Sequence, residues 1–218
     1  NVYEYTKETI EKFQQTGVEI GMVQIGNEIT NGMLGITTNR DAGESYKGIW
    51  ANESKSKQVN KYLSAGSKAV KEVSDALVVL QLETPNVKKF KEIMDTWERD
   101  DVYYDVLGSS YYPYWSTDKK ANTPETLTKV QKLAADYGKL FVVLETSWLT
   151  TVKDADGTPN AVGEWENTSA YPLTAQGQAN MLKDLYDTLG NQDNGLGAFY
   201  WEPAWIPVKA GWNNWEYN

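Results

Sequence analysis

Two glutamates that each follow a short apolar segment are the residues best suited to do chemistry in this chain. Residues 20–25 form one such segment, which stops at Gly26-Asn27-Glu28, and residues 140–144 form another, which ends at Glu145. The chain contains no histidine and no cysteine, which excludes Ser-His-Asp and Cys-His catalysis and any zinc site built from those residues. Acid–base chemistry must therefore come from carboxylates, tyrosine or lysine.

A pair of carboxyl groups is sufficient to break a glycosidic bond. In a retaining glycosidase the two groups lie about 5–5.5 Å apart, where one protonates the leaving oxygen and the other attacks the sugar. Their environments must differ, because the acid must hold its proton while the nucleophile stays ionised. Tyr111 or Tyr112 is placed to donate a hydrogen bond to Glu145 from the neighbouring strand, and both are candidates to contact the substrate. Asn27 is placed to bind the sugar 2-hydroxyl.

The elements that must position these residues alternate between helices and strands. We expect helices over residues 3–15, 54–74, 86–99, 123–137 and 174–189, and strands over residues 20–25, 76–80, 106–111, 140–144 and 195–201. Nearly continuous apolar strands between amphipathic helices imply a parallel sheet with both faces covered. Either a doubly wound α/β sheet or a (β/α)8 TIM barrel fits this pattern.

Polar residues at the strand ends favour the barrel, because catalytic residues of barrels lie there. Four of the five predicted strands end in such residues, which are Asn27-Glu28, Tyr111-Tyr112, Glu145 and Trp201-Glu202. No G-x-G-x-x-G motif follows a strand, so a dinucleotide site has no support.

Five strands are too few to close a barrel. A closed barrel needs eight strands and typically about 250 residues, whereas this chain has 218 residues. We therefore expect residues 1–218 to be the C-terminal portion of one catalytic domain, with strands 4–8 of the barrel. Strands 1–3 would lie on an N-terminal fragment or another chain, or they would be deleted.

Composition narrows the possible partners. Acidic residues outnumber basic ones by 30 to 21, and no basic patch typical of nucleic-acid binding is visible. No apolar run reaches the roughly 18–20 residues that cross a bilayer. The chain has 9 Trp and 14 Tyr but only 4 Phe, a balance that suits half-wet sites such as sugar clefts as well as ordinary cores. The absence of cysteine is compatible with a secreted bacterial enzyme, and we expect a secreted, bacterial protein.

Four motifs, in order along the chain, resemble those of the arabinogalactan endo-β-1,4-galactanases of glycoside hydrolase family 53. They are VQIGNEITNGML at 23–34, DVLGSSYYP at 105–113, VLETSW at 143–148 and FYWEPAWIP at 199–207. The resemblance implies a barrel that hydrolyses internal β-1,4-galactosyl bonds of galactan with retention, without an organic cofactor. It also implies that Glu28 is the acid/base and Glu145 the nucleophile, and that the match begins at the helix before the fourth strand.

Two positions depart from the family pattern. The family commonly has Trp after Gly-Met-Leu, but this chain has Gly35, so a cleft platform is either lost or supplied by Trp50. The fifth strand of relatives often ends near a His, where this chain has Gln81. Gln81 can keep one hydrogen bond but cannot titrate.

The long loop between the last two predicted strands holds a candidate calcium site. Bacterial members of the family look similar here and bind calcium, which implies ligation by the side chains of Asp154, Asp156 and Asn160 and the carbonyl of Thr158. Calcium prefers such oxygen ligands. The alternative is an ordinary Asp-Gly turn.

Aromatic residues at the last strand are candidates for sugar stacking. Trp201 and Trp205 are the first choices, although Trp201 could equally belong to the core, and Glu202 could bind sugar hydroxyls. Two other functions stay open. One is a related barrel endoglycanase acting on mannan or cellulose, and the other is a non-catalytic glycan-binding barrel, which would have no need of two converging carboxyl groups.

Overall fold

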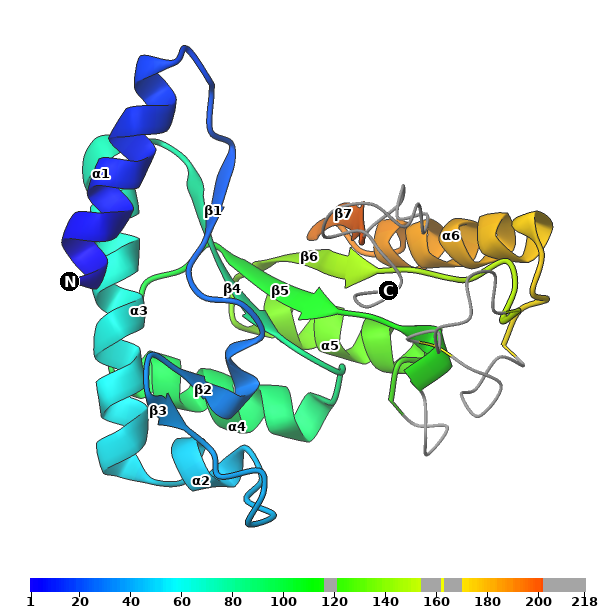
Figure 1. Cartoon of the computed structure of the whole chain (residues 1–218), viewed down its shortest axis with the longest axis horizontal. Helices are drawn as coiled ribbons and strands as arrows, with labels where there is room; N and C mark the ends of the chain where they lie inside the picture. Colours follow the sequence, from blue (N-terminus) through cyan, green and yellow to red (C-terminus); the bar gives the residue numbers. More distant parts are fainter. Residues whose placement is uncertain (116–120, 154–161, 163–169, 202–218) are drawn as a thin grey trace.

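A five-stranded parallel sheet, in the order β1-β4-β5-β6-β7, is the centre of the molecule (Figure 1). The computed structural model describes residues 1–115, 121–153, 162 and 170–201. The strands of the sheet are β1 (Met22–Gln24), β4 (Leu77–Leu82), β5 (Val106–Ser110), β6 (Leu140–Thr146) and β7 (Gly195–Tyr200). The helices are α1 (Val2–Gln15), α2 (Lys47–Trp50), α3 (Glu53–Val73), α4 (Val87–Arg99), α5 (Pro124–Asp136) and α6 (Ala175–Gly190).

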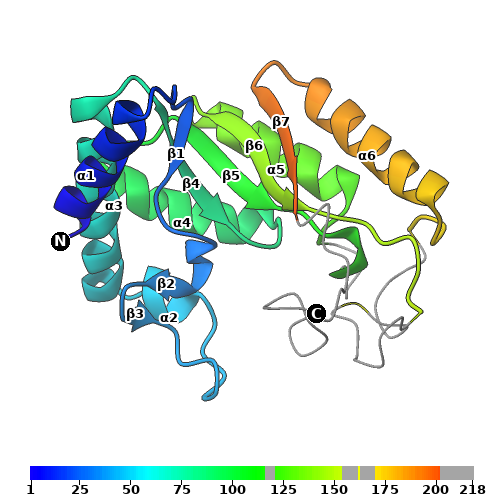
Figure 2. The same ribbon diagram turned by 45° about the horizontal axis from the view of Figure 1, so that its top comes forward.

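The alternating helices and strands predicted from the sequence are confirmed. The short elements are new: the 3-10 turns η1 (Ile29–Asn31) and η2 (Pro113–Trp115), the helix α2, and a hairpin of β2 (Gly32–Met33) and β3 (Ile36–Thr37). The strands pair in parallel and in chain order. Figure 2 shows the long helices on one side of this curved sheet, as in part of a (β/α)8 barrel.

Side-chain caps fix where the long helices begin. Asn52 caps α3, Asn86 caps α4, Thr123 caps α5 and Thr174 caps α6, in each case by accepting a hydrogen bond from a backbone N–H in the first turn. Such caps satisfy donors that a helix start leaves unpaired. The start of each of these helices is therefore set by a local side-chain contact, whatever the length of the connection from the strand before it.

The two faces of the sheet differ. The main core lies between the sheet and the helices, where Leu80, Leu107 and Phe141 are fully buried. On the opposite face Val79, Val106 and Val142 form a small separate cluster. Because side chains alternate along a strand, every second residue beyond this cluster lies on the same face of the sheet. The site described below lies on that face, at the strand ends.

Both outer strands have one free edge in the described part of the chain, since β1 pairs only with β4 and β7 only with β6. Exposed apolar side chains gather near both edges. Tyr5, Phe13, Val18 and Leu34 lie on or near α1 and the hairpin, and Leu196, Phe199 and Trp201 lie on or next to β7. Exposed apolar patches usually mark contact surfaces.

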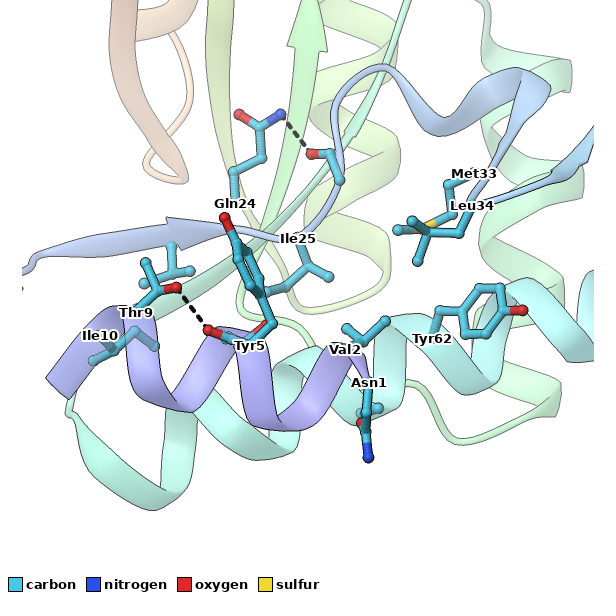
Figure 3. Close-up of a pocket in the computed structure, with 14 residues that line it drawn as sticks. Asn1, Val2, Tyr5, Thr9, Ile10, Gln24, Ile25, Met33, Leu34 and Tyr62 are labelled. Carbon is cyan, nitrogen blue, oxygen red and sulfur yellow. Dashed lines mark hydrogen bonds between the residues drawn. The ribbon is translucent and has the colours of Figure 1, made fainter. Parts of the chain in front are cut away.

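A largely apolar cavity of about 850 Å³ adjoins the free edge of β1 (Figure 3). Val2, Tyr5 and Ile10 line it from α1, and Ile25 and Leu34 from the chain around β1 and the hairpin. The open edge therefore carries both unpaired backbone groups and a hollow of apolar side chains.

Among the described residues, no helix is long and apolar enough to span a membrane.

Gly66 gives a test of how α3 fits against the sheet. A Cβ at Gly66 would lie 2.7 Å from Cγ2 of Ile25, the residue that leads into the Glu28 segment. Overpacking costs about 1–3 kcal/mol, while alanine gains about 1 kcal/mol in helix propensity. We expect Gly66→Ala to lower the free energy of unfolding by about 1 kcal/mol in urea denaturation of the intact polypeptide. Gly190→Ala is the control, because a Cβ there meets nothing within 4 Å; equal effects of the two substitutions would contradict this packing.

Candidate active site

A register shift between β5 and β6 turns Glu145 toward the site. Leu144 packs against the small cluster on the helix-free face, so strict alternation would point Glu145 toward the helices. The pairing changes from Ser109 opposite Val143 to Ser110 opposite Glu145, which adds one residue to β6. This bulge brings Glu145 to the same face as Ser110.

Glu28 reaches the site through a tight turn after β1. Gly26 has φ of 76° and Glu28 has φ of 44°, a left-handed conformation that non-glycine residues rarely adopt. The backbone N–H of Glu28 donates to Oε1 of Gln81 at 3.1 Å. This hydrogen bond ties the turn to the end of β4.

Two polar side chains link the glutamates. The Ser110 hydroxyl donates to Oε1 of Glu28 at 2.5 Å. The Gln81 side-chain amide donates from Nε2 to Oγ of Ser110 at 3.1 Å and to Oε1 of Glu145 at 3.0 Å. The two carboxyl groups therefore face one shared network across β4, β5 and β6.

The carboxyl of Glu28 holds its proton more tightly than an exposed glutamate. Burial raises its pKa most, and the negative charges of Glu145 and Glu83 raise it further. The hydrogen bond from Ser110 and the charge of Lys89 act in the opposite direction but do not cancel the rise. A half-buried carboxyl of this kind suits a general acid.

Tyr112 supports Glu145 from the other side. Its hydroxyl donates to Oε2 of Glu145 at 2.9 Å. Burial and the neighbouring charge of Glu145 raise the pKa of Tyr112 well above its ordinary value, so the hydroxyl keeps its proton. Both oxygens of Glu145 thus accept a hydrogen bond from a side chain, which holds the carboxyl group in place.

Two neighbouring cavities share Glu28, and one of them also holds Glu145. One of about 600 Å³ is lined by both Glu28 and Glu145, together with aromatic side chains that include Tyr112, Trp115 and Trp201. The other, of about 630 Å³, is more polar and shares Glu28, Tyr112 and Trp115 with the first. The apolar cavity at β1 is larger but holds neither glutamate, so the chemistry belongs to the smaller pair.

Several predicted site residues lie in these cavities. Asn27 is exposed in the polar cavity, where its Oδ1 accepts from Gln24 at 3.2 Å. Trp201 is 50% exposed and lines the first cavity. Of the two tyrosines, Tyr112 is the donor to Glu145. Tyr111 is buried and lines neither cavity, so its predicted contact with substrate has no support in this geometry.

Other predicted residues lie outside the described part of the chain. Glu202 and Trp205 belong to this group, as do the proposed calcium ligands Asp154, Asp156, Thr158 and Asn160. Within the described ranges, no group of three or more acidic residues is arranged to hold a metal ion. The calcium site therefore stays a prediction.

The suggestion that Trp50 replaces a missing cleft platform is wrong. Trp50 is only 4% exposed, its ring packs edge-on against Trp97, and its Nε1 donates to the carbonyl of Thr30 at 2.6 Å. Sequence reasoning missed Trp115, which is 43% exposed beside Tyr112. It also missed Ser110, although its place directly before Tyr111 at a strand end was a usable signal.

Comparisons with known proteins identify the family. The family model described as "Glycosyl hydrolase family 53" matches residues 1–218. This chain belongs to glycosyl hydrolase family 53. A curated relative, the "Endo-beta-1,4-galactanase" of Bacillus subtilis, is 39% identical over 211 residues, which cover 95% of this chain and 44% of that protein. The "Arabinogalactan endo-beta-1,4-galactanase A" of Aspergillus niger is 28% identical, over 96% of this chain and 56% of that protein.

A solved structure of the family agrees with the fold. The "GH53 catalytic domain" of Ignisphaera aggregans matches with a TM-score of 0.81 and 31% identity, over 100% of this chain and 58% of that chain. The sheet described above is thus part of the (β/α)8 barrel of family 53. The chain spans about half the length of the curated relatives that it matches.

The two tryptophans of opposite exposure give a further test. Trp50→Ala empties a buried site and should cost about 3–5 kcal/mol of unfolding free energy. Trp201→Ala, at the rim of the cavity, should change it by no more than about 0.5 kcal/mol. Urea denaturation of the intact polypeptide measures both, and an equal loss from the two variants would show that the assignment of core and rim is wrong.

Proposed function

We propose that this chain carries the catalytic carboxyl pair of a retaining endo-β-1,4-galactanase, with Glu28 as acid/base and Glu145 as nucleophile. The observation that carries the proposal is the shared cavity in which the two glutamates have different surroundings. Glu28 is half-buried with a raised pKa and accepts a single hydrogen bond from a side chain among the described residues. Glu145 accepts one at each oxygen.

Double displacement follows from these roles. In the first step the Glu28 carboxyl gives its proton to the glycosidic oxygen, while a Glu145 oxygen attacks the anomeric carbon and the bond to the leaving sugar breaks. In the second step the Glu28 carboxylate takes a proton from water, whose oxygen attacks the same carbon and releases Glu145. The two inversions together retain the β configuration.

Galactan is the proposed substrate because several of the curated relatives are named endo-β-1,4-galactanases. The aromatic side chains of the cavity suit a sugar, since its apolar ring face can stack on them. Trp115 and Trp201 are the exposed candidates for this contact. A secreted location would suit a polymeric substrate and is part of the proposal.

Replacement of each glutamate tests the roles separately. Glu145→Ala should abolish turnover of β-1,4-galactan while keeping its affinity, and added azide should restore bond cleavage with formation of an α-galactosyl azide. Glu28→Ala should lose about 10²–10⁴-fold on galactan but much less on an aryl galactoside, whose leaving group needs no proton. Product analysis by NMR and calorimetric binding provide the measurements.

The wild-type protein decides between this function and its alternatives. Faster hydrolysis of mannan or cellulose than of galactan would assign another endoglycanase. Tight binding of galactan without any hydrolysis would assign a glycan-binding barrel. A β-galactosyl azide from Glu145→Ala would overturn its role as nucleophile.

We propose further that three preceding βα units of the same barrel complete the site. Relatives are about twice as long as the matched region, and β1 and β7 each have a free edge with exposed apolar side chains beside it. The strand of the nearest unit would pair with β1 and fill the apolar cavity of Figure 3.

Residues 1–218 alone should therefore be inactive on galactan and should self-associate, because open sheet edges bind other strands. Joining or adding the preceding units should give a soluble monomer with activity. Size-exclusion chromatography and a galactan assay test this. A soluble, active monomer of residues 1–218 alone would contradict barrel completion while leaving the roles of the glutamates intact.

A further inference from the structure

We propose that Gln81 is a positioning residue that distinguishes the roles of the two glutamates. Its amide donates directly to Glu145, and it also donates to the Ser110 hydroxyl, whose own proton is thereby turned toward Glu28. The inference rests on the proposed function and deepens it. Gln81 is fully buried and lines neither cavity that holds a glutamate. It therefore acts through Glu28 and Glu145 and does not touch the substrate.

The backbone of Glu28 fixes which way the Gln81 amide points. Oxygen and nitrogen of a glutamine side chain look alike, so their places are assigned from hydrogen-bond partners. A backbone N–H can only donate, and the N–H of Glu28 lies 3.1 Å from one end of the amide. That end must be the carbonyl oxygen, which also accepts from Nε2 of Gln24 at 2.5 Å. The NH2 group then faces Ser110 and Glu145.

This orientation also fixes the Ser110 proton. The amide nitrogen of Gln81 donates to Oγ of Ser110, so the hydroxyl proton of Ser110 must point away from Gln81. It is donated to Oε1 of Glu28. Oε1 of Glu28 is therefore an acceptor. The proton that Glu28 delivers as an acid must lie on Oε2, for which no partner is found among the described residues.

The Gln81 orientation also gives Glu145 more hydrogen-bond donors than Glu28. Among the side chains of the described residues, Gln81 and Tyr112 donate to the carboxyl group of Glu145, while Ser110 alone donates to that of Glu28. Glu83 and Lys89, whose charges also act on the Glu28 pKa, form an ion pair at 3.0 Å, and Arg40 lines the polar cavity beside Glu28. With a donor at each oxygen, Glu145 is the more firmly held of the two carboxyl groups.

All four hydrogen-bonding positions of the Gln81 amide are filled. An amide does not titrate, so the arrangement stays the same across the working pH range. A carboxyl group of the same shape would change it, because an ionised carboxylate has no proton to donate. Replacement of the amide by a carboxyl group therefore keeps the packing but changes the hydrogen bonds, which distinguishes a positioning role from a packing role.

Two substitutions with side chains about as long as glutamine test the proposal, in a polypeptide that includes the preceding βα units. Gln81→Glu keeps the acceptor for the Glu28 N–H but loses both donors when ionised, and Gln81→Met loses every hydrogen bond. We expect kcat/KM on galactan to fall about 10²-fold or more for both near neutral pH, as when one preorganised donor is removed. The loss should be in kcat, with KM changed less than about threefold.

The pH profile separates the two variants. Activity of Gln81→Glu relative to wild type should rise as pH falls, because protonation restores one donor, whereas the ratio for Gln81→Met should show no such rise. Ser110→Ala is the matched control: it removes the hydrogen bond that lowers the Glu28 pKa, so the basic limb of its profile should move to higher pH. Near-wild-type activity of Gln81→Glu at neutral pH, or a ratio that is constant with pH, would overturn the proposal.

A spectroscopic readout serves even if the wild type fails to hydrolyse galactan. The Gln81 side-chain amide protons, identified in ¹H–¹⁵N spectra as the pair lost in Gln81→Met, should exchange slowly with water and shift as the glutamates titrate. Fast exchange with no titration shift would overturn the positioning role. Failure of galactan hydrolysis with this signature present would instead overturn the proposed function alone.

Discussion

The site depends on one added residue in β6. Without the register shift at Ser110 and Glu145, the alternation of the strand would bury Glu145 among the apolar side chains between sheet and helices, where an ionised carboxylate is very costly. The bulge instead places it at the helix-free face, beside Gln81 and Tyr112. The two donors on the Glu145 carboxyl group depend on that placement.

The polar network gains its precision from the scaffold beneath it. Gln81 lies two residues after Val79 on β4, and Ser110 ends the neighbouring strand β5, which pairs with both β4 and β6, so backbone pairing sets their spacing. Preorganised donors of this kind need no rearrangement during reaction. The network is buried and well satisfied, which is the condition under which buried polar groups add order instead of instability.

Much of this architecture was predictable from sequence, because the apolar periodicity and the capping residues act locally. The strand ends at Glu28 and Glu145 were also readable, since polar residues interrupted apolar runs. The bulge was not predictable, because it is defined by the pairing of β6 with β5, and the sequence around Glu145 does not specify that pairing. Trp50 was misjudged for a related reason: a tryptophan serves a core or a cleft equally well, and only its neighbours decide which.

The strand order has a consequence for how the molecule forms. Every pairing in the sheet joins strands that are consecutive among its five members, so each new βα unit adds to the one made just before it. Parallel pairing across an intervening helix is slow to form. The hydrogen bonds that link Glu28 and Glu145 come from β4, β5, β6 and the turn after β1, and none of them requires β7. Completion of this network therefore does not depend on the pairing of β7 with β6.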